Sequence, residues 1–370
     1  MGIAIQPYTE DRIQAVSAFN QRLAQGGCAA EFWFPESNIP HWLPKKDGRR
    51  IFQEYYLAVE GEFVRGGFIL KYQDFAFRGQ NYAVAYYHLP ISEGIVNKTY
   101  ATTGVLMLRS AMKMQPMLFA LGMGGFENPL PTMLKAMGWS LCAVPFYFRV
   151  NHPFRFLRNI GRLHRSLSGI AFTEVAAFTG AGWAGIKTIH WMRSRNTIRG
   201  LEIEPVTTFG AWADKLWQKC SPLYAMIASR ESSVLNSLYP PGKNFLCFKI
   251  LRGSQVAGWA VVLDTQMRRN KYFGNLQVGS IVDCLSTPEN ASAVVQAAAG
   301  VLQRRGVDLV ISNHSHAAWG NAFRAAGFLS GPSNFILAAS KPLAQLLAPF
   351  ASCENEVYLM RGDGDGPVNL

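Results

Sequence analysis

The feature that most constrains this 370-residue chain is an internal repeat, because three landmarks of the first half recur in the same order in the second. They are an Ile-x-Pro-x-Thr segment before a predicted helix, a glycine-bounded hairpin, and a Gly-aromatic pair that ends a short helix: Ile5–Thr9 and Ile203–Thr207, Gly61–Phe68 and Gly253–Ala260, Gly138–Trp139 and Gly327–Phe328. The offsets between the copies drift slowly, from 198 to 192 to 189 residues. Such an ordered series is hard to obtain by chance, so we predict two copies of one fold.

The second copy contains the clearest pattern of elements, a strand, a helix, a strand and a helix within residues 276–328. An apolar run of strand length is followed by Ser286–Glu289, which has the cap residue and early proline of a helix start. Apolar residues at helical spacing extend this helix to about Arg305, and Leu309–Ile311 is a second short strand. A helix between two strands makes them parallel, so polar residues after each strand share the ligand-binding edge of the sheet.

This unit resembles the core of the GNAT acyltransferase superfamily. The resemblance rests on the aliphatic strand Leu309–Ile311 and on Gly327-Phe328 at the end of the second helix. Two positions depart from the family: Phe323 stands where a tyrosine general acid is frequent, and His316 stands where an asparagine is frequent. The resemblance also implies a glycine-rich turn for the pyrophosphate of coenzyme A, but Ser286–Asn290 occupies that place. The motifs therefore specify the fold better than the cofactor.

Both copies follow the sheet plan of a GNAT domain, so the chain looks like a tandem-GNAT protein. That group includes Fem-type aminoacyltransferases and acyltransferases of amino-sugar and cell-envelope metabolism. We predict an α/β fold of the mixed-sheet (α+β) kind, with two GNAT-like domains in tandem; a generic α/β fold is the alternative. The predicted parts are an N-terminal domain at 1–150, a basic helical connector at 151–200, a C-terminal domain at 201–340, and a helix, a strand and a Gly/Asp tail at 341–370. The tail is similar to that of GNAT-like proteins from exopolysaccharide clusters.

Composition supports a globular chain with an anionic partner. Apolar residues make up 49% of the chain and charged residues 16%, with a net charge of +12. The six cysteines show no C-x-x-C spacing, which argues against a zinc site or a disulfide framework and for reduced thiols. The N-terminus has no basic stretch followed by an apolar run, so we predict no secretory signal and a cytoplasmic location.

The connector at 151–200 holds eight basic residues against one acidic residue, Glu174. A basic amphipathic helix is predicted because four arginines share one face, with apolar residues on another: Arg155, Arg158, Arg162 and Arg165. The uncharged run Val175–Ile186 is shorter than the ~18 residues that a membrane-spanning helix needs. Two alternatives stay open: an inter-domain helical pair with solvated arginines, or a surface helix in peripheral contact with an anionic membrane.

Polar residues at the sheet edge of the second copy suggest a catalytic base. Asp283 and Cys284 end one strand, and His314 and His316 follow the next. Because adjacent parallel strands bring these ends together, Asp283 with His314 or His316 is a candidate base and orienter pair. The alternative is that Asp283 caps a loop and the histidines bond only the backbone. We treat Cys284 as a buried thiol rather than a nucleophile.

Candidate cofactor-binding residues follow the equivalent strand in each copy. In the first copy, Gly94 before a helix and Lys98 one turn further resemble a phosphate-binding turn, although Glu93 would repel phosphate. Neither copy has the full Gln/Arg-x-x-Gly-x-Gly/Ala pattern of the family. The predicted cofactor ligands are Ser92, Gly94 and Lys98 in the first copy and Ser286, Thr287 and Asn290 in the second.

Candidate substrate-binding residues lie on two other segments. The hairpin tip of the second copy carries Arg268, Arg269 and Lys271, which would suit a nucleotide phosphate, a uronic acid or a tRNA backbone, or only solubility. In the first copy, His88 and Glu127 lie at the predicted sheet edge.

We therefore predict an N-acyltransferase that moves an acyl group from acetyl-CoA or another acyl-CoA to an amine of a sugar nucleotide, an amino acid or a cell-envelope precursor, including those of polysaccharide biosynthesis. We predict neither a metal cofactor nor DNA binding. Two alternatives stay open: a Fem-like transferase that uses aminoacyl-tRNA, for which the positive charge is suited, and a degenerate scaffold on a membrane polysaccharide-assembly complex. The sequence does not decide which copy is active.

Overall fold

The computed structural model describes residues 2–37, 39–40, 42–156, 198, 200–270, 272–353 and 355–364. The chain divides into two compact units, each made of two stretches of sequence. Unit 1 comprises Met1–Cys142 and Ile336–Ser352, and unit 2 comprises Ala143–Phe335 and Cys353–Leu370.

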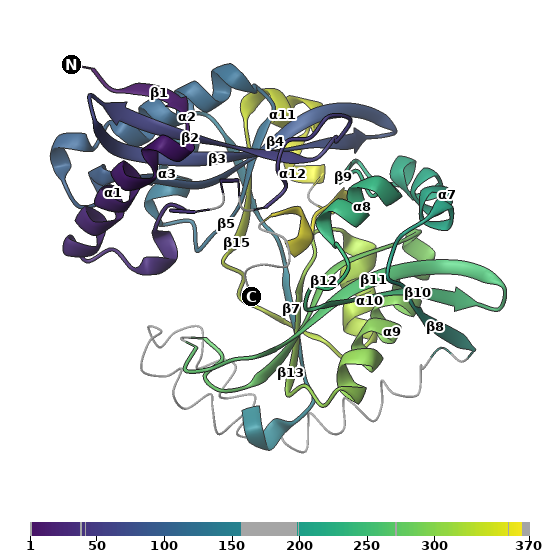
Figure 1. The fold of residues 1–370 in the computed structure, drawn as a ribbon. Helices are drawn as coiled ribbons and strands as arrows, with labels where there is room; N and C mark the ends of the chain where they lie inside the picture. Colours follow the sequence, from purple (N-terminus) through teal and green to yellow (C-terminus); the bar gives the residue numbers. More distant parts are fainter. Residues whose placement is uncertain are drawn as a thin grey trace. The chain divides into compact units, whose positions relative to one another are not determined.

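The sheet of unit 1 has the strand order β1-β2-β3-β4-β5-β15-β6 (Figure 1). Strands β1 to β4 are antiparallel to their neighbours, and β5 is parallel to β4 because helix α2 crosses over between them. The bounds are β1 Ala4–Pro7, α1 Ile13–Gln25, β2 Phe52–Glu60, β3 Phe63–Phe77, β4 Gln80–Ser92, α2 Thr103–Met114, β5 Leu118–Met123, α3 Pro129–Ala136, β6 Ser140–Ala143, β15 Phe335–Ala339 and α11 Lys341–Leu346.

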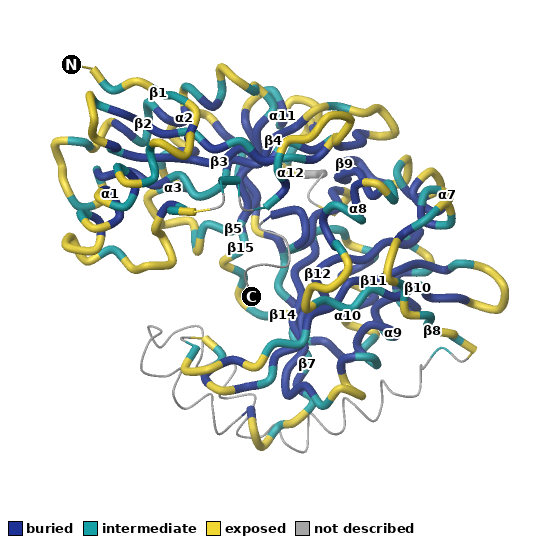
Figure 2. Tube along the Cα trace, viewed as in Figure 1, coloured by how far each residue is buried: buried dark blue, intermediate teal, exposed yellow. Residues whose placement is uncertain are grey.

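Helices cover both faces of this sheet because successive strand residues point to opposite sides. Val16, Phe19 and Leu23 recur at helical spacing on α1 and are fully buried against one face. Met107 and Leu108 of α2 are buried in the cluster of the other face. Figure 2 shows the buried strands between these helices. Each such side chain contributes about 1.5–3 kcal/mol through its burial.

The sheet of unit 2, taken from β8, has the order β8-β10-β11-β12-β13-β7-β14. Strands β12 and β13 are its parallel pair, and helix α9 crosses over between them. The bounds are β7 Phe146–Val150, β8 Leu201–Pro205, α7 Ala211–Cys220, β9 Met226–Ala228, α8 Ser232–Leu238, β10 Phe245–Arg252, β11 Gln255–Gln266, β12 Gln277–Ser286, α9 Ala291–Arg304, β13 Leu309–Asn313, α10 Ala317–Ala325, β14 Leu329–Gly331, α12 Phe350–Cys353 (in the stretch that joins the units), β16 Val357–Tyr358 and η7 Arg361–Asp363.

The two sheets correspond strand for strand, but each takes its sixth strand from the other half of the chain. Strand β15 lies between β5 and β6 in the sheet of unit 1, whereas β7 lies between β13 and β14 in the sheet of unit 2. The predicted domain limits of 1–150 and 201–340 assigned these two strands the other way round. Sequence order alone does not reveal the exchange, since each strand directly follows the last strand of its own copy.

The predicted two-copy fold is confirmed by this correspondence of the sheets. Gly61 and Gly253 turn equivalent hairpins with φ of 58° and 60°, and Gly138 and Gly327 end equivalent helices with φ of 82° and 86°. These positive values favour glycine, which explains why the landmarks are visible in the sequence.

The predicted basic connector lies mostly outside the described residues, at 157–197 and 199. In the part of the chain that the structure describes, no helix has the length and apolar character required to cross a bilayer.

Candidate functional site

Each sheet contains one parallel strand pair that separates before its strands end. In unit 1, β4 pairs with β5 only as far as Tyr86, although β4 continues to Ser92. In unit 2, β12 pairs with β13 only as far as Ser280, although β12 continues to Ser286. The carboxyl ends of parallel strands are where α/β proteins bind ligands. These two edges are therefore the candidate sites, one in each unit.

The edge of unit 2 is bridged by residues 355–364 of the same unit, which we call the C-terminal strap. The Ser315 amide donates to the Leu359 carbonyl at 3.2 Å just beyond β13, and the Tyr358 hydroxyl donates to the Cys284 carbonyl in β12. Residues from Val357 to Met360 are buried. The strap thus joins the two strands where their own pairing has ended.

A buried arginine between two carboxylates fastens the strap. Arg230 Nη2 lies 3.1 Å from Asp283 Oδ1 on β12 and 2.7 Å from Asp363 Oδ1 on the strap, with no side chain more than 1% exposed. The Tyr239 hydroxyl donates to Asp283 Oδ2 at 2.8 Å. Burial raises the pKa of Asp283 to about 6, and the charge of Arg230 opposes that rise. Asp283 is consequently an internal anchor of unit 2.

The predicted pairing of Asp283 with His314 or His316 differs from the structure. His314 is fully buried, stacks on Trp319 with ring centroids 5.0 Å apart, and accepts from the His316 amide at 3.1 Å. His316 caps α10 by accepting an amide hydrogen bond through Nδ1. Burial lowers the pKa of both imidazoles. Neutral imidazoles satisfy a buried carboxylate less well than a guanidinium, so Asp283 pairs with Arg230 instead.

The predicted cofactor ligands of unit 2 bond to one another. Ser286 Oγ donates to the Thr287 carbonyl at 2.9 Å, and Asn290 Nδ2 donates to Thr287 Oγ1 at 3.1 Å. Ser286 and Thr287 are buried. The segment forms a short 3-10 turn ahead of α9 rather than a glycine-rich cradle.

The predicted substrate-binding cations of unit 2 lie at the β11–β12 hairpin tip. Arg268 and Arg269 are exposed, and the backbone of Arg269, with φ of 49°, is held by a 2.8 Å hydrogen bond from its amide to Asn275 Oδ1. Lys271 lies outside the described residues. The two described arginines therefore lie on a surface turn.

In unit 1 the segment between β4 and α2, residues 92–102, contains the predicted phosphate turn. Ser92 Oγ accepts from the Gly94 amide at 3.0 Å, and Lys98 is exposed in a second short turn. A Cβ on Gly94 would lie 2.6 Å from the Tyr100 carbonyl oxygen, so this position requires glycine. At the first residue of α2, the buried Thr103 hydroxyl has no hydrogen-bond partner within the described part of the chain.

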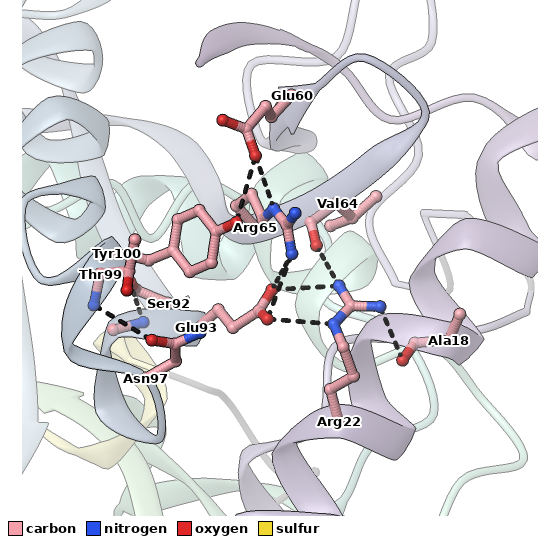
Figure 3. Close-up of polar contacts among 11 residues, drawn as sticks. Ala18, Arg22, Glu60, Val64, Arg65, Ser92, Glu93, Asn97, Thr99 and Tyr100 are labelled. Carbon is pink, nitrogen blue, oxygen red and sulfur yellow. Dashed lines mark hydrogen bonds and ion pairs between the residues drawn. The ribbon is translucent and has the colours of Figure 1, made fainter. Parts of the chain in front are cut away.

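Glu93, which the sequence presented as unfavourable to phosphate, is neutralised by two arginines (Figure 3). Arg22 of α1 donates through Nε and Nη2, each at 3.1 Å. Arg65 of β3 donates through Nη1 to both carboxylate oxygens at 3.2 and 3.1 Å. The buried carboxylate therefore leaves no net negative charge beside the turn.

His88 lies on β4 next to the point where the strands separate. The Tyr86 hydroxyl donates to the Leu121 carbonyl at 3.1 Å, and His88 Nδ1 lies 3.3 Å from the same hydroxyl oxygen. Since the Tyr86 proton is used toward Leu121, Nδ1 of His88 is the donor to Tyr86. This arrangement favours the tautomer in which Nε2 carries the lone pair.

Two non-glycine residues with positive φ mark the same edge of unit 1. Leu89, with φ of 44°, lies in a bulge of β4, and Met123, with φ of 67°, ends β5. Such conformations cost roughly 1–3 kcal/mol each and concentrate at functional sites. The corresponding bulge of β12, at Val282, has no positive φ. Glu127 is exposed in the loop after β5.

The sequence interpretation missed the arginines that organise both edges. Arg22 and Arg65 bind Glu93 although they are separated from it by 71 and 28 residues in the sequence. Arg230 binds Asp283 across a sequence separation of 53 residues. Lys71 was also missed; it is buried on β3 with its Nζ 5.6 Å from the Tyr86 ring centroid. One signal was present, because Glu93 stands in the predicted phosphate turn, where a carboxylate would require a nearby cation.

No protein-family model matches the chain, and no curated protein matches it in sequence. Solved structures match nearly its whole length. A probable N-acyltransferase of unknown function from Enterococcus faecalis has 9% identity and a TM-score of 0.52, covering 93% of this chain and 74% of that one. A GCN5-related N-acetyltransferase from Anabaena variabilis has 10% identity and a TM-score of 0.52, covering 91% and 72%.

Saccharomyces cerevisiae N-myristoyltransferase, solved with bound myristoyl-CoA and inhibitors, has 9% identity and a TM-score of 0.51, covering 91% of this chain and 79% of that one. At such low identities the likeness shows the fold alone. The chain therefore has a mixed α/β fold with two GNAT-like domains.

Proposed function

We propose that this protein is an N-acyltransferase whose acyl-CoA donor binds at the β4–β5 edge of unit 1. The observation that carries the proposal is the backbone strain at Leu89 and Met123, one on each of the two separating strands. Strained backbone conformations persist only where the surrounding structure enforces them, and they are concentrated at functional sites. The equivalent edge of unit 2 is bridged by the strap, so one donor site per chain is expected.

The residues that follow β4 suit the pyrophosphate of coenzyme A. Helix α2 spans twelve residues, and its N-terminal amides carry a partial positive charge. Lys98 adds a cation less than two turns before the helix, and the buried Thr103 hydroxyl offers a hydrogen bond that no described residue takes. Because Arg22 and Arg65 balance Glu93, its carboxylate does not oppose phosphate binding.

We assign His88 as the general base. In N-acyl transfer the acceptor amine attacks the thioester carbonyl carbon, the C–N bond forms, the C–S bond breaks to release coenzyme A as its thiolate, and the amine gives its proton to Nε2 of His88. His88 is half-buried beside the strand separation, and its bond to Tyr86 directs Nε2 as the proton acceptor. A positioned base of this kind contributes roughly 10²–10⁴-fold to the rate.

The acceptor we propose is an amine of a sugar nucleotide, an amino acid or a cell-envelope precursor. The net charge of +12 favours an acceptor that also carries anionic groups.

Titration calorimetry of the full chain with acetyl-CoA and with a long-chain acyl-CoA tests the donor site. We expect binding of at least one donor with one site per chain. Absence of binding by both donors, or two equivalent sites per chain, would contradict the proposal.

Substitution of the base tests the chemistry separately from binding. His88→Gln should lower turnover at least a hundredfold with the donor Kd unchanged. His152→Gln is the matched control, because His152 is half-exposed and bonds Asp308 in unit 2 at 3.0 Å. Equal turnover of His88→Gln and the wild type would remove His88 from the mechanism.

A further inference from the structure

One arginine holds both ends of the segment between β4 and α2. At the start of the segment, Arg65 Nη1 binds both carboxylate oxygens of Glu93. Near its end, the Arg65 guanidinium carbon lies 4.2 Å from the Tyr100 ring centroid. Figure 3 shows the Arg65 guanidinium beside the Tyr100 ring, with dashed lines to Glu93. A single side chain on the rigid strand β3 therefore fixes the separation of the two ends.

Glu60 completes the hold on Tyr100. Its Oε2 accepts from Arg65 Nε at 3.0 Å and from the Tyr100 hydroxyl at 3.3 Å. Arg65 thus bonds a carboxylate on either side, which orients the planar guanidinium against the ring. These bonds raise the pKa of Arg65 despite the opposing effect of its burial, so the side chain is always charged.

Arg22 ties the same carboxylate to the helix side of the unit. Besides Glu93, it donates to the carbonyls of Val64 at 2.6 Å and Ala18 at 3.1 Å. The guanidiniums of Arg22 and Arg65 are both directed at Glu93. Both arginines therefore use these hydrogen bonds to hold Glu93 in place, and we do not assign them as ligands of phosphate oxygens.

The segment is closely packed in this shape. The Gly94 Cα faces the backbone of Tyr100 and Ala101 so closely that a Cβ would come within 3.0 Å of both residues. The Gly94 turn and the Lys98 turn are thus brought against each other before α2 begins. A donor that meets a preformed site loses less conformational entropy than one that must order a loop.

We propose that Arg65 is a positioning residue for the acyl donor: by binding Glu93 and stacking on Tyr100, it holds residues 92–102 in the shape that receives the donor's pyrophosphate. This inference rests on the proposed function of unit 1. It gives Arg65 no contact with the donor, and its effect passes through the shape of the turn.

The test compares Arg65→Lys with the wild type. Lysine keeps the positive charge. It lacks the second N–H group, with which arginine bonds Glu60 as well as Glu93, and it lacks the planar guanidinium that stacks on the Tyr100 ring. We expect the KM and Kd for acetyl-CoA to rise about tenfold and kcat at saturation to stay within about twofold. Arg12→Lys is the matched control, because Arg12 pairs with the exposed Glu62 at 3.2 Å in the same unit, and its KM should not change.

A second pair of variants keeps the test decisive if Arg65→Lys does not fold. Tyr100→Leu removes the ring and should raise the KM several-fold, whereas Tyr100→Phe keeps the ring, loses only the 3.3 Å hydrogen bond to Glu60, and should change the KM by less than about twofold. A merely structural role predicts lower melting temperatures with an unchanged KM in every folded variant, and this result would overturn the inference.

The inference and the proposed function fail in different ways. If the wild type binds no coenzyme A thioester in calorimetry, the proposed function fails, and the positioning role fails with it. If the wild type binds the donor and both Arg65→Lys and Tyr100→Leu bind it equally tightly, only the positioning role is refuted.

Discussion

Replacing Gly362 by alanine should weaken unit 2, because the strap passes too close to its neighbours for a side chain. A Cβ at this position would lie 2.5 Å from the Tyr239 hydroxyl and 3.1 Å from Asp283 Oδ2. The hydroxyl must retreat by nearly 1 Å to reach ordinary contact, which would strain or break its 2.8 Å hydrogen bond to Asp283.

Overpacking of this kind costs about 1–3 kcal/mol, and loss of a hydrogen bond to a charged group adds roughly 1.5–3 kcal/mol. We expect a loss of about 3 kcal/mol in the free energy of unfolding of unit 2. For a unit of this size, each kcal/mol shifts Tm by roughly 2–4 °C, so Tm should fall by about 6–12 °C.

Gly300→Ala in α9 is the matched control. It makes the same substitution in the same unit, but it should raise the free energy of unfolding instead of lowering it. The nearest atom to its Cβ is Arg304 Nη1 at 3.6 Å, an ordinary contact. Alanine in a helix interior is more stable than glycine by roughly 0.5–1 kcal/mol.

Calorimetric melting gives Tm, and hydrogen exchange of residues 355–364 localises the effect. The Met360 amide, which donates to Asp363 Oδ2 at 2.8 Å, should lose protection in Gly362→Ala and keep it in Gly300→Ala. The reasoning is refuted if Gly362→Ala melts with the wild type and its strap amides remain protected.

Three further outcomes follow from the same contacts. Arg230→Met should cost about 3–5 kcal/mol in urea denaturation, because it strands two buried carboxylates; a loss below about 1 kcal/mol would show that water reaches them. Since burial raises the pKa of Asp283 from 3.8 to about 6, the folded state binds that proton more tightly than the unfolded state, and the wild type should lose stability as pH rises through that interval. Asp283→Asn should abolish this component in unfolding curves measured across the interval, and parallel curves for the two proteins would contradict it. Gly94→Ala should raise the Kd for acetyl-CoA in calorimetry at least severalfold, because its Cβ would push the Tyr100 backbone away; an unchanged Kd would argue against a preformed turn.

Much of the fold can be predicted from the sequence because its hairpins, helix ends and helix faces depend on residues that are close together in the chain. Hairpin and helix-end glycines such as Gly61 and Gly327 adopt positive φ, and few other residues tolerate that conformation. The predicted helix from Ser286 to about Arg305 corresponds to α9 with its preceding turn, since its apolar spacing reflects packing on the sheet.

The strand exchange and the strap are not visible in this way. β7 and β15 are ordinary apolar strands, and nothing local distinguishes the sheet that each one joins. A strand was predicted within 341–370, and β16 lies there, but the place of the strap between β12 and β13 depends on Arg230 and Asp363, which lie 133 residues apart. Contacts between such distant positions leave no periodic trace in a single sequence.

The candidate site shows the same division. Gly94 and Lys98 stand in a motif-like turn and His88 lies on a predicted strand, so local patterns were enough to propose them as site residues, and they stay predictions. The predicted Asp283–histidine pair failed for a physical reason, because adjacency of strand ends brings residues near without deciding their hydrogen bonds. A buried carboxylate takes the strongest donor in reach, and Arg230 is that donor.

The exchange of β7 and β15 also bears on how the protein is made. While the chain emerges from the ribosome, the sheet of unit 1 stays one strand short until residues 335–339 have been synthesised, although its other strands are complete by residue 143. A fragment that contains only the first copy would carry β7, which belongs to the sheet of unit 2. A fragment that contains only the second copy would carry β15, which belongs to the sheet of unit 1. The two halves therefore mature together, and neither half of the gene encodes a self-sufficient sheet.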